Sequence, residues 1–228
     1  MAISASEVKA LAAEWGADLC GIAPVDRFEG APEGFHPCDV LPGCRSVVVL
    51  ARRFLISTLS ATSGVPYTIV RNKLSDAMDV LSLKVAYALE AEGALAVPTG
   101  AIEPCNWDAA TKKTMGLISL KHAAVRAGLG TMGKNTLLIN DRYGNMLWLS
   151  AVLTSAELDP DPLATYEGCI PGCTLCLQSC PVQALDGVSI DYQACWDHAF
   201  GTENGGEWRI KCYTCRKVCP HALGPQIT

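Results

Sequence analysis

The sequence predicts an α+β protein in two parts, an α/β layer structure followed by a cysteine-rich part that holds metal. Hydrophobic residues make up 50% of the 228 residues, which is enough to bury a sizeable core. In the first part, short apolar runs alternate with segments of helical periodicity. Eight of the twelve cysteines fall between Cys169 and Cys219. The uneven cysteines predict one domain over 1–154 and a second, which includes a linker, over 155–228.

The first elements follow from local patterns. A capping box, Ser4-x-x-Glu7, precedes an amphipathic pattern that predicts a helix over 5–16. Apolar runs over 17–25 and 46–50 are bounded by polar residues, and the second is rich in valine. Both runs therefore predict strands.

The rest of the first domain is predicted in the same way. Apolar residues recur at helical spacing from Leu74 to Leu89, and Gly93 is typical of the end of a helix. A short strand over 94–97, a helix near 117–127 and two strands around 141–145 complete the domain. The prolines of 155–168 disfavour helix, so this segment is predicted to be an extended connection.

Composition restricts the class of protein. No apolar run approaches the roughly 20 residues that span a bilayer, and no export signal is recognisable, so the chain is expected in the cytoplasm without membrane attachment. In that reducing compartment, metal ligation explains twelve cysteines better than disulfides do. The net charge of −5 makes nucleic-acid binding unfavourable.

The cysteine-rich part repeats one motif. Cys173-x2-Cys176-x3-Cys180-Pro181 and Cys212-x2-Cys215-x3-Cys219-Pro220 are spaced as in two-cluster bacterial ferredoxins, where the last cysteine of each motif binds the other [4Fe–4S] cluster. Cys169 and Cys195 precede the motifs and complete two sets of four thiolates. One predicted set is Cys169, Cys173, Cys176 and Cys219, and the other is Cys180, Cys195, Cys212 and Cys215. Cys169 is one residue further from its motif than is usual.

A zinc ribbon is the alternative for these cysteines. The pairs Cys173-x2-Cys176 and Cys212-x2-Cys215 could together supply four thiolates to one zinc ion. That arrangement leaves both cysteine–proline pairs, and the cysteines that precede the motifs, without a role.

Several segments of the first domain resemble the epoxyqueuosine reductase family. The most distinctive is Lys121–Ile139, with the sequence KHAAVRAGLGTMGKNTLLI. Further similar segments are 18–23, 41–50 and 143–154, and the order of the cysteine motifs also matches. The resemblance covers nearly the whole chain.

This resemblance implies a fold, cofactors and partners. It implies a nitroreductase-like α/β domain that can hold a corrinoid of the cobalamin type, followed by the ferredoxin-like domain, a plan that reductive dehalogenases share. Electrons from a donor such as a ferredoxin or flavodoxin would pass through the clusters to the corrinoid, which would reduce an unidentified substrate. Flavin in place of the corrinoid is one alternative. A non-enzymatic electron carrier, or a reductant of a partner's metal cofactor, is another.

The candidate cofactor-binding residues lie in a glycine-rich loop. Gly128, Gly130 and Gly133 would let the backbone approach a flat ring, and Lys134 and Asn135 would face the polar substituents of that ring. The alternative is a helix C-cap followed by a tight turn, which needs no cofactor.

The chain departs from the family pattern at the expected proton donor. Where the family has an acid before a Thr-Gly pair, this chain has Pro98 before Thr99-Gly100, and proline cannot deliver a proton. Glu103 and His122 are the candidate catalytic residues that remain. An insertion between Glu103 and Gly128, and the end of the chain nine residues after Cys219, also differ from the tRNA-modifying enzyme. Epoxyqueuosine in tRNA is therefore not the expected substrate.

The other four cysteines lie outside the motifs. Cys20 and Cys44 are in or beside apolar runs and are predicted to be buried as small hydrophobic side chains. The roles of Cys38 and Cys105, which lie near prolines, stay open.

Overall fold

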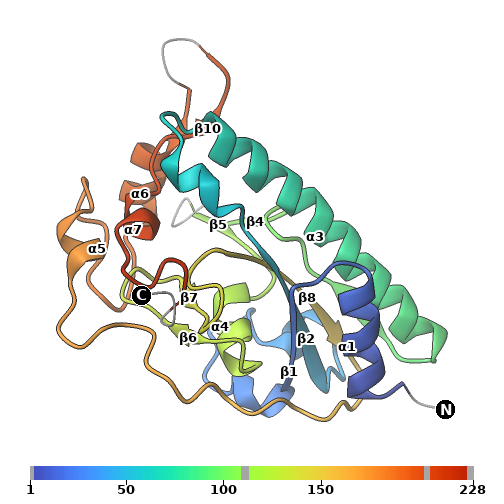
Figure 1. Ribbon diagram of the computed structural model, residues 1–228. Helices are drawn as coiled ribbons and strands as arrows, with labels where there is room; N and C mark the ends of the chain where they lie inside the picture. The colour runs from blue at the N-terminus through green and yellow to red at the C-terminus, as the bar shows by residue number, and fades with distance from the viewer. Residues whose placement is uncertain (1–2, 109–112, 203–205, 225–228) are drawn as a thin grey trace. The chain divides into compact units, whose positions relative to one another are not determined.

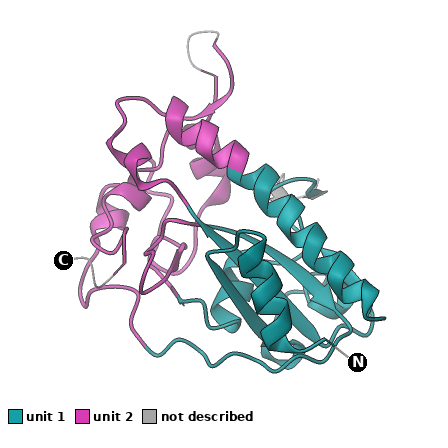
Figure 2. Cartoon of the chain, turned by 45° about the vertical axis from the view of Figure 1, so that its right-hand side comes forward, with its two compact units in different colours: residues 1–53, 74–130, 148–165 teal, residues 54–73, 131–147, 166–228 magenta. Residues whose placement is uncertain are grey.

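The computed structural model describes residues 3–108, 113–202 and 206–224 (Figure 1). By contacts the chain divides into two compact units, coloured in Figure 2. Unit 1 comprises residues 1–53, 74–130 and 148–165, and unit 2 comprises 54–73, 131–147 and 166–228. The units are interleaved along the chain, whereas the predicted domains, 1–154 and 155–228, are consecutive.

Unit 1 is built on a four-stranded sheet with the order β1-β2-β8-β3. Its strands are β1 (Leu19–Pro24), β2 (Ser46–Arg53), β3 (Ala96–Pro98) and β8 (Leu147–Thr154). β1 pairs antiparallel with β2, and β3 pairs antiparallel with β8. The first six residues of β2 are all buried, because both faces of this strand are covered.

Helices cover both faces of the unit 1 sheet. α1 (Ala5–Glu14) and α3 (Val65–Ala91) share one hydrophobic core with Val48 and Leu50 of β2. On the other side, α4 (Leu120–Arg126) contacts β1 and β2. Alternate residues of β2 therefore face opposite helical layers, as the two-residue period of a strand requires.

Asp161 fixes the segment that follows β8. Its carboxylate lies 2.5 Å from Lys9 Nζ and accepts a hydrogen bond from the Ile22 amide at 2.8 Å. The Arg27 guanidinium donates to the Asp161 carbonyl. The segment is irregular, as predicted for a connection, but these contacts attach it to α1 and β1.

Unit 2 consists of short elements and loops. It contains the hairpin of β6 (Thr131–Met132) and β7 (Leu138–Ile139) and the hairpin of β9 (Phe200–Gly201) and β10 (Arg209–Ile210). Its short helices are α5 (Leu175–Gln178), α6 (Tyr192–Ala199) and α7 (Thr214–Lys217), and α5 packs against α7. Residues 65–73 of α3 also belong to this unit.

The remaining elements are short. They are the helix α2 (Pro37–Val40), the 3-10 helices Val25–Phe28 and Ile56–Ser60, and the hairpin of β4 (Asn106–Asp108) and β5 (Lys113–Met115). The hairpin lies in the insertion between Glu103 and Gly128, of which residues 109–112 are outside the described residues.

The predicted α+β class is confirmed, and most predicted elements exist. The capping box at Ser4 and Glu7 is present at the start of α1. The two strands predicted around 141–145 are β7 and β8, which lie on either side of that turn. The apolar residues at helical spacing from Leu74 to Leu89 lie in the later part of α3, which starts at Val65. A proline at residue 66 is compatible with the first turn of a helix, so it does not delay the start.

No helix among the described residues is long and apolar enough to cross a membrane.

Candidate metal centres

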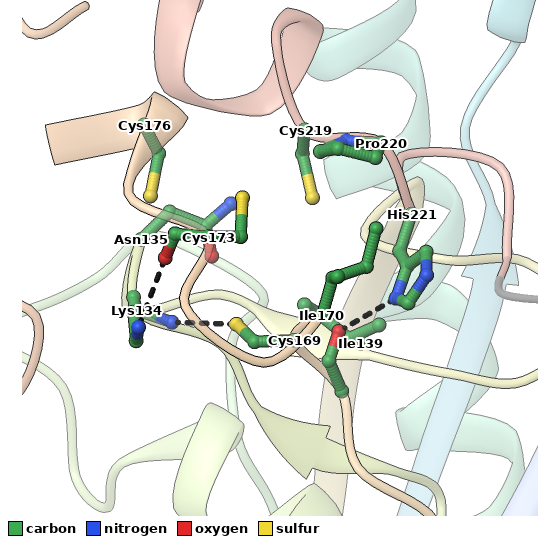
Figure 3. A pocket seen from close by; sticks show the side chains of 11 residues that line it. Lys134, Asn135, Ile139, Cys169, Ile170, Cys173, Cys176, Cys219, Pro220 and His221 are labelled. Atoms are coloured by element: carbon green, nitrogen blue, oxygen red, sulfur yellow. Dashed lines mark hydrogen bonds between the residues drawn. The ribbon is translucent and has the colours of Figure 1, made fainter. Parts of the chain in front are cut away.

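Four cysteines of unit 2 line one pocket, which we call site A. They are Cys169, Cys173, Cys176 and Cys219, and Figure 3 shows their sulfur atoms facing a common space. Pro220 and His221 also line the pocket, and His221 Nδ1 lies 2.9 Å from the Gly168 carbonyl oxygen. The structure therefore brings together one of the two predicted sets of four thiols.

The thiols of site A act on one another. Burial raises the pKa of Cys176, and Cys169 and Cys173 raise it further. Burial likewise raises the pKa of Cys219, with smaller contributions from the same neighbours. Metal binding would remove these protons, because a cysteine ligates as the thiolate.

The other four cysteines of the motifs form a second group, which we call site B. Burial raises the pKa of the Cys215 thiol to about 11, the Arg216 guanidinium opposes this shift, and Cys195, Cys212 and Cys180 add to it. The Cys215 sulfur therefore lies close enough to the other three to interact with them. These four are the second predicted set.

The two motifs have the same local structure. The residues after each first cysteine form a single helical turn, α5 or α7, and the chain leaves this turn at the last cysteine of the motif. The proline that follows each motif cannot donate the backbone hydrogen bond that would extend the turn. The last cysteine of each motif consequently joins the other group: Cys219 lies in site A and Cys180 interacts with site B.

This grouping differs from the zinc-ribbon alternative. A ribbon needs Cys173 and Cys176 beside Cys212 and Cys215, but the structure places the two pairs in different sites. Within the described residues, no three His, Cys, Asp or Glu side chains are arranged to hold a single metal ion. The donor chemistry of each site, four thiols without a carboxylate, fits a [4Fe–4S] cluster.

The turn of the β6–β7 hairpin contributes polar groups to site A. The Lys134 amide lies 3.4 Å from the Cys169 sulfur, and its Nζ donates to the Cys173 carbonyl at 2.9 Å (Figure 3). Amide hydrogen bonds to a ligating sulfur stabilise negative charge on it. Lys134 also brings a positive charge to the pocket.

Asn135 links the same turn to site B. Its Nδ2 donates to the Cys215 carbonyl at 3.2 Å, and its Oδ1 accepts from the Leu137 amide. Lys134 and Asn135 were predicted to face the polar substituents of a bound ring. Their hydrogen bonds instead go to the cysteine loops and to their own turn, a role that the sequence analysis missed.

The glycines of the same segment are explained by folding alone. Gly128 ends α4 with a φ of 74°, and a Cβ on it would lie 2.0 Å from the Pro162 carbonyl oxygen. A Cβ on Gly133 would lie 2.6 Å from Ile139 Cδ1, because Gly133 starts the hairpin turn. This is the predicted alternative of a C-cap followed by a tight turn. The positions that a Cβ would take on Gly128 and Gly133 are occupied by the chain itself, so folding alone accounts for both glycines; Gly130 is buried.

Aromatic and basic side chains surround site B. The Tyr213 ring, beside Cys212 in the sequence, stacks on Tyr67 with ring centroids 4.1 Å apart. Tyr67 also packs against Phe54, at 4.5 Å between centroids. Arg216, in α7 next to Cys215, is 7% exposed. Residues 54–73 thus supply part of the wall around a site whose ligands lie more than a hundred positions later.

The two candidate catalytic residues have contrasting surroundings. Glu103 is exposed, and its backbone carbonyl oxygen occupies the position that a Cβ on Gly100 would take. His122 lies in α4, where Nδ1 is 2.7 Å from Ser119 Oγ; burial, followed by Arg126 and Lys121, lowers its pKa. Because the His122 ring already has a hydrogen-bond partner, no catalytic role is needed to explain its position.

No acid takes the place of Pro98 within its own strand. Pro98 pairs with Val152, and Thr99 continues the ladder by exchanging hydrogen bonds with Ala151. Just after the Thr99-Gly100 pair, the Ala101 amide donates a hydrogen bond to the Asp79 carboxylate of α3 at 2.7 Å. Burial raises the pKa of Asp79, a residue that the sequence analysis did not single out.

Of the four cysteines outside both sites, Cys44 is buried, Cys20 is half-buried, and Cys38 and Cys105 contact backbone carbonyls. Burial raises the pKa of Cys20 to about 12 and that of Cys44 to about 11, which favours the protonated, less nucleophilic thiol. The Cys38 thiol contacts the Cys44 carbonyl at 3.6 Å, and the Cys105 thiol donates to the Ile102 carbonyl.

Comparison with known proteins was made by sequence and by structure. No protein-family model matches the chain. An epoxyqueuosine reductase of Staphylococcus aureus is 35% identical over 122 residues, which are 48% of this chain and 31% of that protein. The epoxyqueuosine reductase of Leadbetterella byssophila is 25% identical over 94% of this chain and 78% of its own length. The predicted resemblance to this family is confirmed.

Solved structures share the fold. The epoxyqueuosine reductase of Streptococcus thermophilus superposes with a TM-score of 0.67 at 20% identity, over 96% of this chain and 66% of that protein. A reductive dehalogenase, described with a mechanism for B12-dependent dehalogenation, superposes with a TM-score of 0.66 at 19% identity, over 97% and 32%. This chain matches about a third of the length of several of its curated relatives.

Proposed function

We propose that this chain is an iron–sulfur oxidoreductase that holds one [4Fe–4S] cluster at site A and one at site B. The observation that carries the proposal is the crossed grouping of the eight cysteines between Cys169 and Cys219, with Cys219 in site A and Cys180 in site B. The similarity to epoxyqueuosine reductases supports a redox enzyme rather than a protein with structural metal.

The chain's own residues would hold and insulate the clusters. When bound, such clusters gain and lose single electrons. The eight cysteines would supply the thiolates, and the Lys134 amide would donate to the sulfur of Cys169. The stacked Tyr67 and Tyr213 would exclude water on one side of site B. Arg216 and Lys134 add positive charge near the two sites.

The clusters would pass their electrons to an acceptor, which we propose to be a corrinoid. The chain shares its fold with a protein described in terms of B12-dependent dehalogenation, which supports a corrinoid acceptor. The glycine loop does not add to this support, because folding alone accounts for Gly128 and Gly133. The donor would be a small electron-transfer protein such as a ferredoxin or flavodoxin.

A non-enzymatic electron carrier is the second candidate. The observation that favours it is Pro98, which stands beside Thr99-Gly100 in a regular strand and brings no acid to that position. In that case the same clusters would serve a partner instead of a cofactor in this chain.

The test is anaerobic purification followed by analysis of iron, sulfide and the absorption spectrum. We expect about eight iron and eight sulfide per chain. Stoichiometric zinc with little iron would refute the proposal. Titration of the reconstituted protein with cobalamin then separates the acceptors: saturable binding supports the corrinoid enzyme, and its absence under reducing conditions supports the carrier. Bound flavin would be recognised by its own spectrum.

A further inference from the structure

Arg216 is a buried cation without an acidic partner in the described part of the chain. Its side chain is 7% exposed. Lys9–Asp161, Arg45–Glu157 and Arg53–Asp18 are ion pairs among the described residues, and none of them includes Arg216. A buried, unpaired charge costs several kcal/mol in proteins. The negative charge that balances Arg216 is therefore expected to come from a bound group.

Among the described residues, the hydrogen-bond and ring contacts of the Arg216 side chain are with neutral groups. Its guanidinium donates to the Asn145 carbonyl and lies 3.8 Å from Met146 Sδ and 5.9 Å from the centre of the Phe54 ring. Asn145 in turn donates from Nδ2 to the Arg216 carbonyl at 3.4 Å. These contacts hold the side chain in one position, but none of them neutralises it.

Site B lies next to this charge. Arg216 follows Cys215 in α7, and its guanidinium lies over the Phe54 ring. Phe54 packs on Tyr67, which in turn stacks on Tyr213, the neighbour of Cys212 in the sequence. Four thiolates outweigh the positive charge of an iron–sulfide core, so a ligated [4Fe–4S] cluster is an anion, and net charge is one of the factors that set its potential.

We infer that Arg216 is the counter-charge of the cluster at site B and raises the reduction potential of that cluster. The inference rests on the proposed function. The reduced cluster carries one more negative charge than the oxidised one, so a buried cation stabilises the reduced form more. Site A has Lys134 instead, whose side chain is half-buried and better screened by water.

Three variants separate the charge from the shape of the side chain. Arg216→Met removes the charge and keeps an unbranched apolar stem, and Arg216→Lys keeps the charge and loses the planar guanidinium. Arg142→Met is the matched control, because Arg142 is an exposed arginine of the same unit. Each protein is reconstituted with iron and sulfide, its iron is measured, and its clusters are titrated with dithionite under electron paramagnetic resonance detection.

In Arg216→Met, we expect the equilibrium constant for reduction of one cluster to fall at least tenfold. This corresponds to a reduction potential lower by about 59 mV for a one-electron couple. The other cluster should stay within a few-fold of wild type, Arg216→Lys should retain most of the potential, and Arg142→Met should match wild type. Loss of one cluster's iron in Arg216→Met, with full iron in Arg216→Lys, would also support the inference.

Two results would overturn it. Full iron and unchanged potentials in Arg216→Met would show that the charge does not act on a cluster. Loss of iron in both Arg216 variants would show that the guanidinium hydrogen bonds matter and the charge does not. A wild-type protein without iron is a failure of the proposed function instead, and the iron analysis detects it before any titration.

Discussion

Sites A and B are built from the same short motif but have different surroundings. Site A opens to a pocket, and its charged neighbour is Lys134, which reaches it from a hairpin turn. At site B, Tyr213 is next to Cys212 in the sequence and stacks on Tyr67, and the buried Arg216 follows Cys215. The motif thus determines which thiols come together, whereas Lys134 at site A and Tyr67 at site B come from segments far away in the sequence.

The largest expected effect is the loss of one site with retention of the other. Cys176→Ala should remove the cluster of site A, and Cys215→Ala that of site B, so each variant should keep about four of eight iron atoms per chain. Iron and sulfide analysis after reconstitution measures this. If either variant lost all of its iron, the two sites would not be independent, and their contrast could not be assigned to their surroundings.

Gly144→Ala should weaken the support of site A. Gly144 has a φ of 57°, and a Cβ on it would lie 2.2 Å from the His221 carbonyl oxygen, just after Cys219. Overpacking of this kind costs about 1–3 kcal/mol, with backbone strain in addition. Thermal unfolding of the metal-free protein measures the loss. Gly172→Ala is the control, since its φ of 74° has the same strain but nothing lies within 4 Å.

Lys134→Met should make the cluster of site A harder to reduce, but by less than Arg216→Met changes site B. The reason is that water screens a half-buried ammonium more than a buried guanidinium. A redox titration beside Lys217→Met, an exposed lysine of the same unit, gives the comparison. An equal or larger shift at site A would contradict the proposed difference between the sites.

The smallest effect is expected at the cysteines outside both sites. Cys44→Ala should leave the iron content unchanged and cost roughly 1 kcal/mol, because its thiol is 3% exposed and packs in the core. Chemical denaturation and iron analysis of the variant test both parts. Loss of a cluster would show that the assignment of eight ligands is incomplete.

The grouping of the cysteines was predictable from the sequence, whereas the side chains that contact the cysteine loops were not. Spacings of two and three residues fix a local turn, so the crossed pairing of Cys180 and Cys219 follows from the motif itself. The contacts of Lys134 and Asn135 with cysteine loops depend on tertiary structure, which no local pattern encodes. The glycines at 128 and 133 were equally ambiguous, since a C-cap, a turn and a ring-binding loop share the same residue type.

Unit 2 is assembled from three separate stretches of the chain, which has a consequence for protein engineering. The motif cysteines all fall within the last third of the chain, which invites the expression of residues 155–228 as a minimal two-cluster module. That fragment would omit Phe54 and Tyr67, which pack beside Tyr213, and the turn that supplies Lys134 and Asn135. A transplantable module would have to carry 54–73 and 131–147 as well, joined by new linkers, so the boundary visible in the cysteine pattern is not a place to cut.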